Sequence, residues 1–109
     1  MELLITGATG FLGRTLAARL VREGHRVRAL VRAESDPAAR ERLRALGAVE
    51  RVGTVTDEAS VRAAMAGVEA VVHCAQVGAR APREVAEAVN LVGAENVLHA
   101  SRALGVRRL

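Results

Sequence analysis

The stretch Thr6-Gly7-Ala8-Thr9-Gly10-Phe11-Leu12-Gly13 places three glycines between an apolar run and a helical pattern. Each glycine matches a separate need: Gly7 a tight turn, Gly10 close approach of the backbone to a pyrophosphate, and Gly13 close packing of the helix on the strand. Free N–H groups and the positive end of the helix dipole can hold an anion there. A Gly-rich turn without a ligand is the alternative, but the position between strand and helix favours dinucleotide binding.

The rest of the chain alternates apolar, β-branched runs with Ala-rich and Arg-rich stretches of helical period. We expect strands at 2–6, 25–31, 48–53 and 68–75. We expect helices at 11–23, where Leu12, Leu16 and Leu20 stack, after Asp36-Pro37, after a Thr56 or Asp57 cap, and at 83–104. This order predicts an α/β fold, a Rossmann-type doubly wound parallel sheet with strand order 3-2-1-4. Because 106–109 resembles the opening of a fifth strand, we expect the sheet to be truncated after about four strands.

Composition restricts the function classes. The chain has 109 residues, of which 50% are hydrophobic and 26% charged, as in one folded domain. Its net charge is +4, but the arginines alternate with glutamates and Phe11 is the only aromatic residue, so we expect no nucleic-acid partner. The single Cys74 favours a reducing cytoplasm, and no apolar run has the length of a membrane span.

The Gly-rich stretch resembles the cofactor signature of the extended short-chain dehydrogenase/reductase family, which includes nucleotide-sugar epimerases, dehydratases and dihydroflavonol-type reductases. The segments 67–75, 89–98 and 105–109 resemble this family's fourth strand, the long helix after it and the entry to its fifth strand. The resemblance implies that residues 1–109 are the N-terminal part of an NAD(P)-binding Rossmann domain. The motifs are specific for the superfamily but not for a substrate.

The choice of cofactor is read near the end of the second strand, about 20 residues beyond the Gly-rich turn. Arg32 lies there, and its planar guanidinium suits the 2′-phosphate of NADP. Glu34 follows two residues later, so NADP is favoured and NAD is the alternative. Around the third strand, Thr54 stands where the family usually has an adenine-contacting Asp, which puts adenine recognition in doubt. Asp57 is expected to cap a helix.

By position and resemblance, the residues after the fourth strand are expected to touch the nicotinamide ribose. The predicted cofactor contacts are Gly7, Thr9, Gly10, Phe11, Leu12, Gly13, Arg32, Thr54, Ala75, Gln76, Val77 and Gly78.

The chain contains no Tyr and no Lys. In the family it resembles, these two residues perform the proton chemistry, so we assign no catalytic residue here. By resemblance, Asn90 matches an Asn on the long helix that helps organise the proton relay in related members. The alternative is a helix Asn whose side chain bonds to its own backbone or to water. His73 is expected to be a satisfied interior histidine, Cys74 to be inert, and no metal site is predicted.

Three functions remain open. The chain is the cofactor part of an oxidoreductase, epimerase or dehydratase, or a noncatalytic NADP-binding sensor or regulatory module, or a fragment that cannot hold a dinucleotide. The apolar residues of 83–104 cover more than one stripe. We therefore expect a homo-oligomer through this helix or through an exposed sheet edge.

Overall fold

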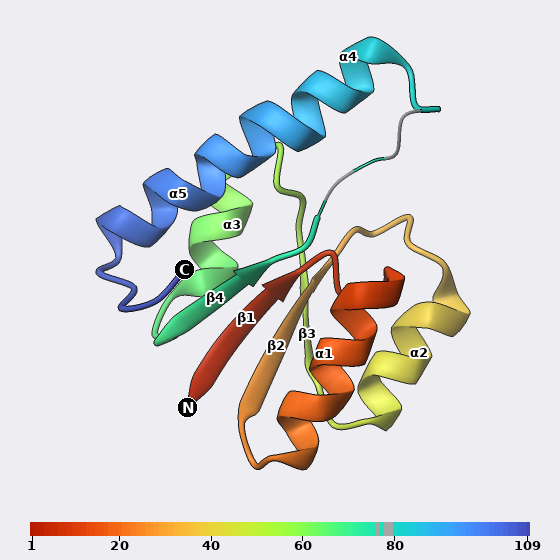
Figure 1. The fold of residues 1–109 in the computed structure, drawn as a ribbon, viewed down its shortest axis with the longest axis vertical. Helices are drawn as coiled ribbons and strands as arrows, with labels where there is room; N and C mark the ends of the chain where they lie inside the picture. The colour runs from red at the N-terminus through yellow and green to blue at the C-terminus, as the bar shows by residue number, and fades with distance from the viewer. Residues whose placement is uncertain (76, 78–79) are drawn as a thin grey trace.

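The computed structural model describes residues 1–75, 77 and 80–109 as a parallel sheet with helices on both faces (Figure 1). The elements along the chain are β1 (Glu2–Thr6), α1 (Phe11–Arg22), β2 (Arg26–Val31), α2 (Pro37–Ala45), β3 (Val49–Val52), α3 (Glu58–Met65), β4 (Ala70–His73), α4 (Arg83–Ala86), η1 (Glu87–Val92) and α5 (Gly93–Ala103).

The four described strands are parallel and lie in the order β3-β2-β1-β4, which confirms the predicted Rossmann-type order. Ile5 pairs with Ala29 of β2 on one side and with Val72 of β4 on the other. Because all four strands run the same way, their carboxyl ends meet at one edge of the sheet (Figure 1). Ligands of open α/β sheets bind at that edge.

The two faces of the sheet carry separate cores. Leu3 and Ile5 pack under α1 and α2, whereas Leu4 packs with α3 and α5 on the opposite face. This alternation is the period of two expected of a strand buried on both sides. Leu12, Leu16 and Leu20 lie one turn apart on α1 as predicted, but only Leu16 and Leu20 pack against the first core, and Leu12 is 60% exposed in the first turn. That turn lies at the carboxyl edge of the sheet, so packing on the first core begins only at Leu16.

Two side chains cap helices as predicted. Asp36 accepts a hydrogen bond from the N–H of Ala38, with Pro37 in the first helical position. Asp57 accepts one from the N–H of Ala59, so Asp57 rather than Thr56 caps α3. A cap satisfies N–H groups that have no partner within the helix.

The long helix occupies nearly its predicted range but changes winding in the middle. Its segments α4, η1 and α5 follow one another, and η1 is a π-helix over Glu87–Val92. A Cβ added at Gly93 would lie 2.6 Å from Cγ2 of Val55, so the glycine lets the helix approach the loop after β3. Asn96 Nδ2 donates to the Val55 carbonyl oxygen across 2.9 Å at the same contact.

The end of the chain returns to the sheet. The N–H of Val71 donates to the carbonyl oxygen of Arg108 across 2.9 Å, and Ala70 forms a parallel bridge with Arg108. The predicted opening of a fifth strand therefore lies beside β4. In the part of the chain that the structure describes, no helix is both long enough and apolar enough to cross a membrane.

Candidate functional site

A groove of about 730 Å³ follows the carboxyl ends of the strands, within the size range of about 300 to 1,000 Å³ typical of ligand sites. It is bounded by the Gly-rich turn, the end of β2, the loop after β3, the segment after β4, and the start of the long helix. Seven predicted contacts line it: Gly7, Thr9, Gly10, Arg32, Thr54, Ala75 and Val77. Phe11, Leu12 and Gly13 do not line it, and Gln76 and Gly78 lie outside the described residues.

Gly7 makes the turn off β1 and is held in place by the segment after β4. Its φ of 68° is in the left-handed region, which favours glycine. A Cβ at this position would lie 2.6 Å from both the Ala75 nitrogen and the Cys74 carbonyl carbon. Conformation and close backbone packing both require a glycine here.

Gly10 and Gly13 differ in what surrounds them. A Cβ at Gly13 would lie 2.1 Å from the Gly7 carbonyl oxygen, so the packing of α1 on the turn excludes a side chain. A Cβ at Gly10 would meet only that same oxygen, at the ordinary contact distance of 3.4 Å. Since Gly10 lines the groove, the free space beside its α-carbon is accessible to a ligand bound in the groove.

The start of α1 points unpaired donors toward this edge of the sheet. Gly10 is the N-cap and provides no side-chain hydrogen bond, and the N–H of Arg14 makes the first helical bond, to the Gly10 carbonyl oxygen at 2.9 Å. The N–H groups of Phe11, Leu12 and Gly13 precede that bond. With the helix dipole they form a site suited to an anion. The side chains of Phe11 and Leu12 are 77% and 60% exposed, so only their backbone takes part.

Asn90 holds Val77, one of the residues that line the groove. Its Oδ1 accepts from the Val77 N–H across 2.8 Å, and its Nδ2 donates to the Val77 carbonyl oxygen across 3.1 Å. The Asn90 amide thus bonds both the N–H and the carbonyl oxygen of Val77, 13 residues away in sequence. Neither sequence interpretation anticipated this: Asn90 bonds to the segment after β4 rather than to its own helix backbone. The π-helical segment η1 carries Asn90.

The end of β2 presents charge to solvent. The Arg32 side chain is 61% exposed, and its Nη1 lies 3.7 Å from Glu34 Oε1, a loose ion pair. The Arg32 N–H donates to Ser35 Oγ across 3.1 Å, which fixes the backbone while leaving the guanidinium free to move. Such an exposed pair contributes little to stability. The arginine can therefore exchange the carboxylate for another anion at small cost.

Thr54 lines the groove from the loop after β3, and its hydroxyl is hydrogen-bonded within that loop. Thr54 Oγ1 is 3.0 Å from Thr56 Oγ1 and accepts from the Thr56 N–H across 3.3 Å. The Thr54 N–H donates to Ser60 Oγ across 3.0 Å. No carboxylate stands at this position, so a ligand meets one hydroxyl where a charged acceptor is usual in the family that the sequence resembles.

Sequence reasoning missed part of the lining. Four residues of the long helix face the groove: Glu84, Val85, Ala88 and Val89. The proline before Arg83 and the loop length from β4 indicate where this helix starts, but the side facing the sheet depends on the π-helical winding of η1. Periodicity at 3.6 residues per turn does not report such a change.

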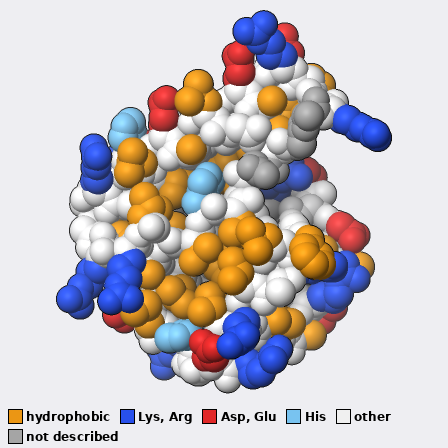
Figure 2. Space-filling view, viewed as in Figure 1, with side chains coloured by type: hydrophobic (Ala, Val, Ile, Leu, Met, Phe, Trp, Pro, Cys, Tyr) orange, Lys and Arg blue, Asp and Glu red, His pale blue; other side chains and the backbone are white. Residues whose placement is uncertain are grey.

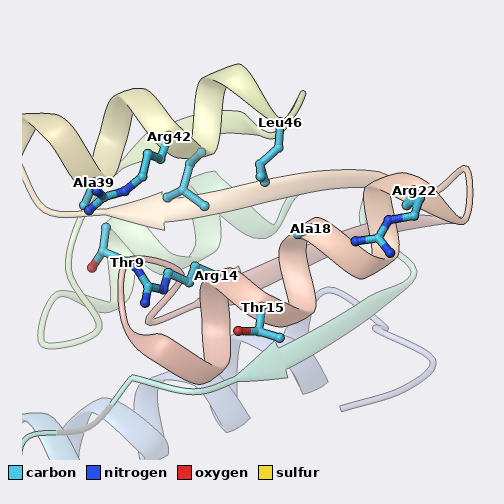
Figure 3. Close-up of a pocket in the computed structure, with 9 residues that line it drawn as sticks. Thr9, Arg14, Thr15, Ala18, Arg22, Ala39, Arg42 and Leu46 are labelled. Atoms are coloured by element: carbon cyan, nitrogen blue, oxygen red, sulfur yellow. The ribbon is translucent and has the colours of Figure 1, made fainter.

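A second hollow, of about 320 Å³, lies between α1 and α2 (Figure 3). Arginines surround an apolar floor that includes Leu46 and Ala18, and Thr9 lines both this hollow and the groove. In Figure 3, Arg14 and Arg42 lie near Thr9 while Arg22 lies at the other end of α1. The Gly-rich turn does not otherwise contribute to it, so the groove is the better candidate site.

Cys74 and His73 lie near the groove, and neither is activated for chemistry by its surroundings. Burial raises the pKa of the Cys74 thiol, which keeps it protonated and unreactive at neutral pH. Burial lowers the pKa of His73. Its Nδ1 lies 2.6 Å from Thr6 Oγ1, so the histidine is hydrogen-bonded as predicted, but it is partly buried rather than interior. Among the described residues, no three His, Cys, Asp or Glu side chains are placed to share a metal ion. The absence of a metal site stays a prediction.

The chain is similar in sequence to a known protein family and to several characterised relatives. Residues 3–109 match the NAD dependent epimerase/dehydratase family. The chain is 42% identical over 112 residues to sterol demethylase protein B of Methylococcus capsulatus, covering 100% of this chain and 33% of that protein. It is 37% identical over 110 residues to a 2-alkyl-3-oxoalkanoate reductase of Stenotrophomonas maltophilia, covering 100% of this chain and 32% of the relative. The chain therefore spans about a third of the length of these curated relatives.

Solved structures agree with the fold. A uronate dehydrogenase mutant from Agrobacterium tumefaciens, complexed with NAD, superposes with a TM-score of 0.74 at 31% identity over 95% of this chain and 37% of that one. A short-chain dehydrogenase/reductase superfamily protein from Agrobacterium tumefaciens with bound NAD superposes with a TM-score of 0.79 at 32% identity, over 97% of this chain and 30% of that one.

Proposed function

The chain belongs to the NAD dependent epimerase/dehydratase family, and we propose that its groove binds NADP in preference to NAD within a larger oxidoreductase, epimerase or dehydratase. The chain is the dinucleotide-binding portion of such a protein. When bound, a nicotinamide dinucleotide supplies hydride transfer, and the protein supplies position and electrostatics.

The observation that carries this proposal is the contrast between Gly10 and its neighbours. Among the described residues, contacts require the glycines at positions 7 and 13, whereas a Cβ at Gly10 would meet nothing closer than the Gly7 carbonyl oxygen at 3.4 Å. Beside it, the first-turn N–H groups of α1 are free to donate. A pyrophosphate on this cradle uses both the open space and the donors.

The preference for NADP rests on Arg32. This guanidinium lines the groove at the end of β2, where the adenosine ribose of a dinucleotide binds, and its present partner Glu34 is held only loosely. A 2′-phosphate offers stronger, bidentate acceptors to the same fork of donors. The neighbouring Glu34 carboxylate can instead accept a hydrogen bond from the 2′-hydroxyl of NAD, so NAD is the alternative cofactor.

Catalysis belongs to the whole protein rather than to this chain. The curated relatives include a 2-alkyl-3-oxoalkanoate reductase, which supports an enzymatic role for a parent protein. This chain has no Tyr and no Lys to move a proton. A noncatalytic NADP-binding sensor or regulatory module is the second candidate. The two are distinguished by whether the parent protein carries, outside this chain, the Tyr and Lys that this chain lacks.

We also propose that the protein self-associates in the cytoplasm. Large apolar side chains along the long helix remain exposed: Val85, Leu91, Val92, Leu98 and Leu104. Figure 2 shows hydrophobic side chains along this helix, with arginines mostly around the margin of the view. Exposed apolar area of this kind marks a contact surface. Sedimentation equilibrium should give a dimer, and a monomer at high concentration would contradict this part of the proposal.

The cofactor proposal is tested by titrating NADP⁺ and NAD⁺ separately into the chain and into an Arg32→Ala variant. We expect the wild type to bind NADP⁺ more tightly. Since a hydrogen bond to a charged group contributes about 1.5 to 3 kcal/mol, Arg32→Ala should weaken NADP⁺ by about 10-fold to 100-fold and leave NAD⁺ unchanged. Equal affinity of the wild type for both nucleotides would show that Arg32 does not select the cofactor.

A further inference from the structure

Thr6 is a fully buried polar residue at the end of β1, and several hydrogen bonds meet at its hydroxyl. The Oγ1 atom lies 3.1 Å from the backbone nitrogen of Cys74 and 3.3 Å from that of Ala75. It also lies 2.6 Å from Nδ1 of His73, the residue paired with Thr6 in the β1–β4 register. One hydroxyl thus joins the strand end to the segment that packs against Gly7.

The proton positions follow from what each group can donate or accept. A threonine hydroxyl has one O–H donor and two acceptor lone pairs. Backbone N–H groups can only donate, so Thr6 Oγ1 accepts from Ala75 and from Cys74, whose N–H is shared with the Thr6 carbonyl oxygen at 3.1 Å. The hydroxyl then donates its hydrogen bond to His73 Nδ1. Nδ1 accepts a hydrogen bond only in the neutral imidazole tautomer that carries its proton on Nε2.

We propose that His73, as this neutral tautomer, is a positioning residue of the dinucleotide groove that aims the Thr6 hydroxyl and thereby holds Cys74 and Ala75 against Gly7. The inference rests on the proposed dinucleotide binding, because Cys74, Ala75 and Gly7 line the groove. His73 does not line the groove, so it acts through Thr6. Without an acceptor at Nδ1, the hydroxyl is free to rotate and the two N–H bonds lose their fixed direction.

Protonation of His73 opposes this arrangement. The charged imidazole donates from both nitrogens, and Thr6 has no third lone pair to receive Nδ1–H, so Nδ1–H displaces one of the two backbone donors from Thr6 Oγ1. A displaced Cys74 N–H still bonds to the Thr6 carbonyl oxygen, whereas a displaced Ala75 N–H loses its bond to Thr6. The hydrophobic residues packed on this face from α3 and the long helix are Val61, Met65, Val89 and Val97. The same elements contribute the buried Ser101 and an ion pair between Glu58 and His99 at 3.6 Å. Cys74, the titratable neighbour in the chain, stays a thiol because burial raises its pKa.

The direction of the pH effect follows from the same surroundings. Burial is the cause that lowers the pKa of His73, with no contribution from an ionised group in the described chain. The neutral form therefore persists to a pH below the ordinary histidine value of about 6.5. Dinucleotide affinity should be constant above that pH and fall as the solution is acidified through the lowered pKa of His73.

The test compares two variants of the full chain. His73→Asn keeps an acceptor oxygen near the Nδ1 position and does not titrate, whereas His73→Leu has no acceptor. NADP⁺ is titrated into wild type and variants between pH 5 and 8, and the backbone amide signals of Cys74 and Ala75 are followed by NMR without nucleotide. Comparing wild type with His73→Asn cancels the titration of the nucleotide phosphate itself.

We expect wild type and His73→Asn to bind equally at pH 7.5, and His73→Leu to bind about fivefold more weakly, the equivalent of one net hydrogen bond. On acidification only wild type should lose this factor relative to His73→Asn, while its Cys74 and Ala75 amide signals shift. A His73→Leu variant with the pH profile and amide signals of wild type would overturn the proposal, as would an Nδ1-protonated tautomer at pH 7.5. Should NADP⁺ fail to bind at any pH, the proposed function fails, and the amide signals still decide the role of His73.

Discussion

The Gly-rich turn and the β2–α2–β3 region lie at neighbouring parts of the groove but are built in different ways. The turn is fixed by backbone contacts: a single Cβ at Gly7 or Gly13 would come within 2.6 Å or 2.1 Å of backbone atoms. The β2–α2–β3 region relies on long charged side chains, with Arg40 and Arg44 both paired to Glu50, and Arg32 exposed. The conformation of the Gly-rich turn is therefore fixed by steric contacts, while Arg32, the residue proposed to select the cofactor, is exposed and can change without disturbing the fold.

The strongest test of this contrast is steric. Gly7→Ala should cost about 2 to 4 kcal/mol of unfolding free energy, because it combines backbone strain with overpacking against Cys74 and Ala75. Gly24→Ala is the matched control, since Gly24 also has a positive φ, of 92°, but has nothing within 4 Å of the added Cβ. The control should lose only about 1 kcal/mol from strain. Urea denaturation measures both, and equal losses would mean that the contact with Cys74–Ala75 is unimportant.

The second test concerns the segment that faces the turn. Asn90→Leu removes both hydrogen bonds to Val77 and should cost about 1 kcal/mol, since these bonds are partly solvated. Asn90→Asp keeps the acceptor for the Val77 N–H and should lose less. The midpoint of urea denaturation ranks the three proteins. If Asn90→Leu is as stable as the wild type, the bidentate contact does not hold the segment.

The smallest expected effect lies in the charged region and depends on pH. Burial tends to raise the pKa of Glu50, but the hydrogen bonds from Arg44 and Arg40 outweigh it and lower the pKa below 4.5. A lowered carboxyl pKa stabilises the folded chain above the unfolded value and loses that contribution as the pH falls through the folded value. The unfolding free energy of wild type should fall between pH 7 and pH 3, and that fall should be smaller in Glu50→Gln, as measured by urea denaturation at both pH values. An equal fall in both proteins would show that Glu50 does not contribute to the loss of stability in acid.

Much of this structure could be predicted from the sequence, for reasons that vary between the two regions. The strands and a cap at Thr56 or Asp57 follow from local pattern, because apolar periodicity and capping chemistry act over a few residues. The strand order follows from the doubly wound fold that the alternation of strands and helices predicts. The contact of Asn90 with Val77 could not be predicted, since it joins positions 13 residues apart across a π-helical segment. The motif predicts Phe11 and Leu12 as cofactor contacts, yet both residues are largely exposed and neither lines the groove.

Gly10→Ala provides the most direct test of the central claim, that the Gly-rich turn is an anion cradle whose open space belongs to a dinucleotide. The measurement is a calorimetric titration of NADP⁺ into wild type and Gly10→Ala, together with their urea midpoints. Because the added Cβ meets only the Gly7 oxygen at 3.4 Å, stability should change by no more than about 0.5 kcal/mol. Binding should weaken at least about tenfold, as the methyl group displaces the pyrophosphate from the N–H donors. Unchanged NADP⁺ affinity in a stable Gly10→Ala variant would contradict the claim.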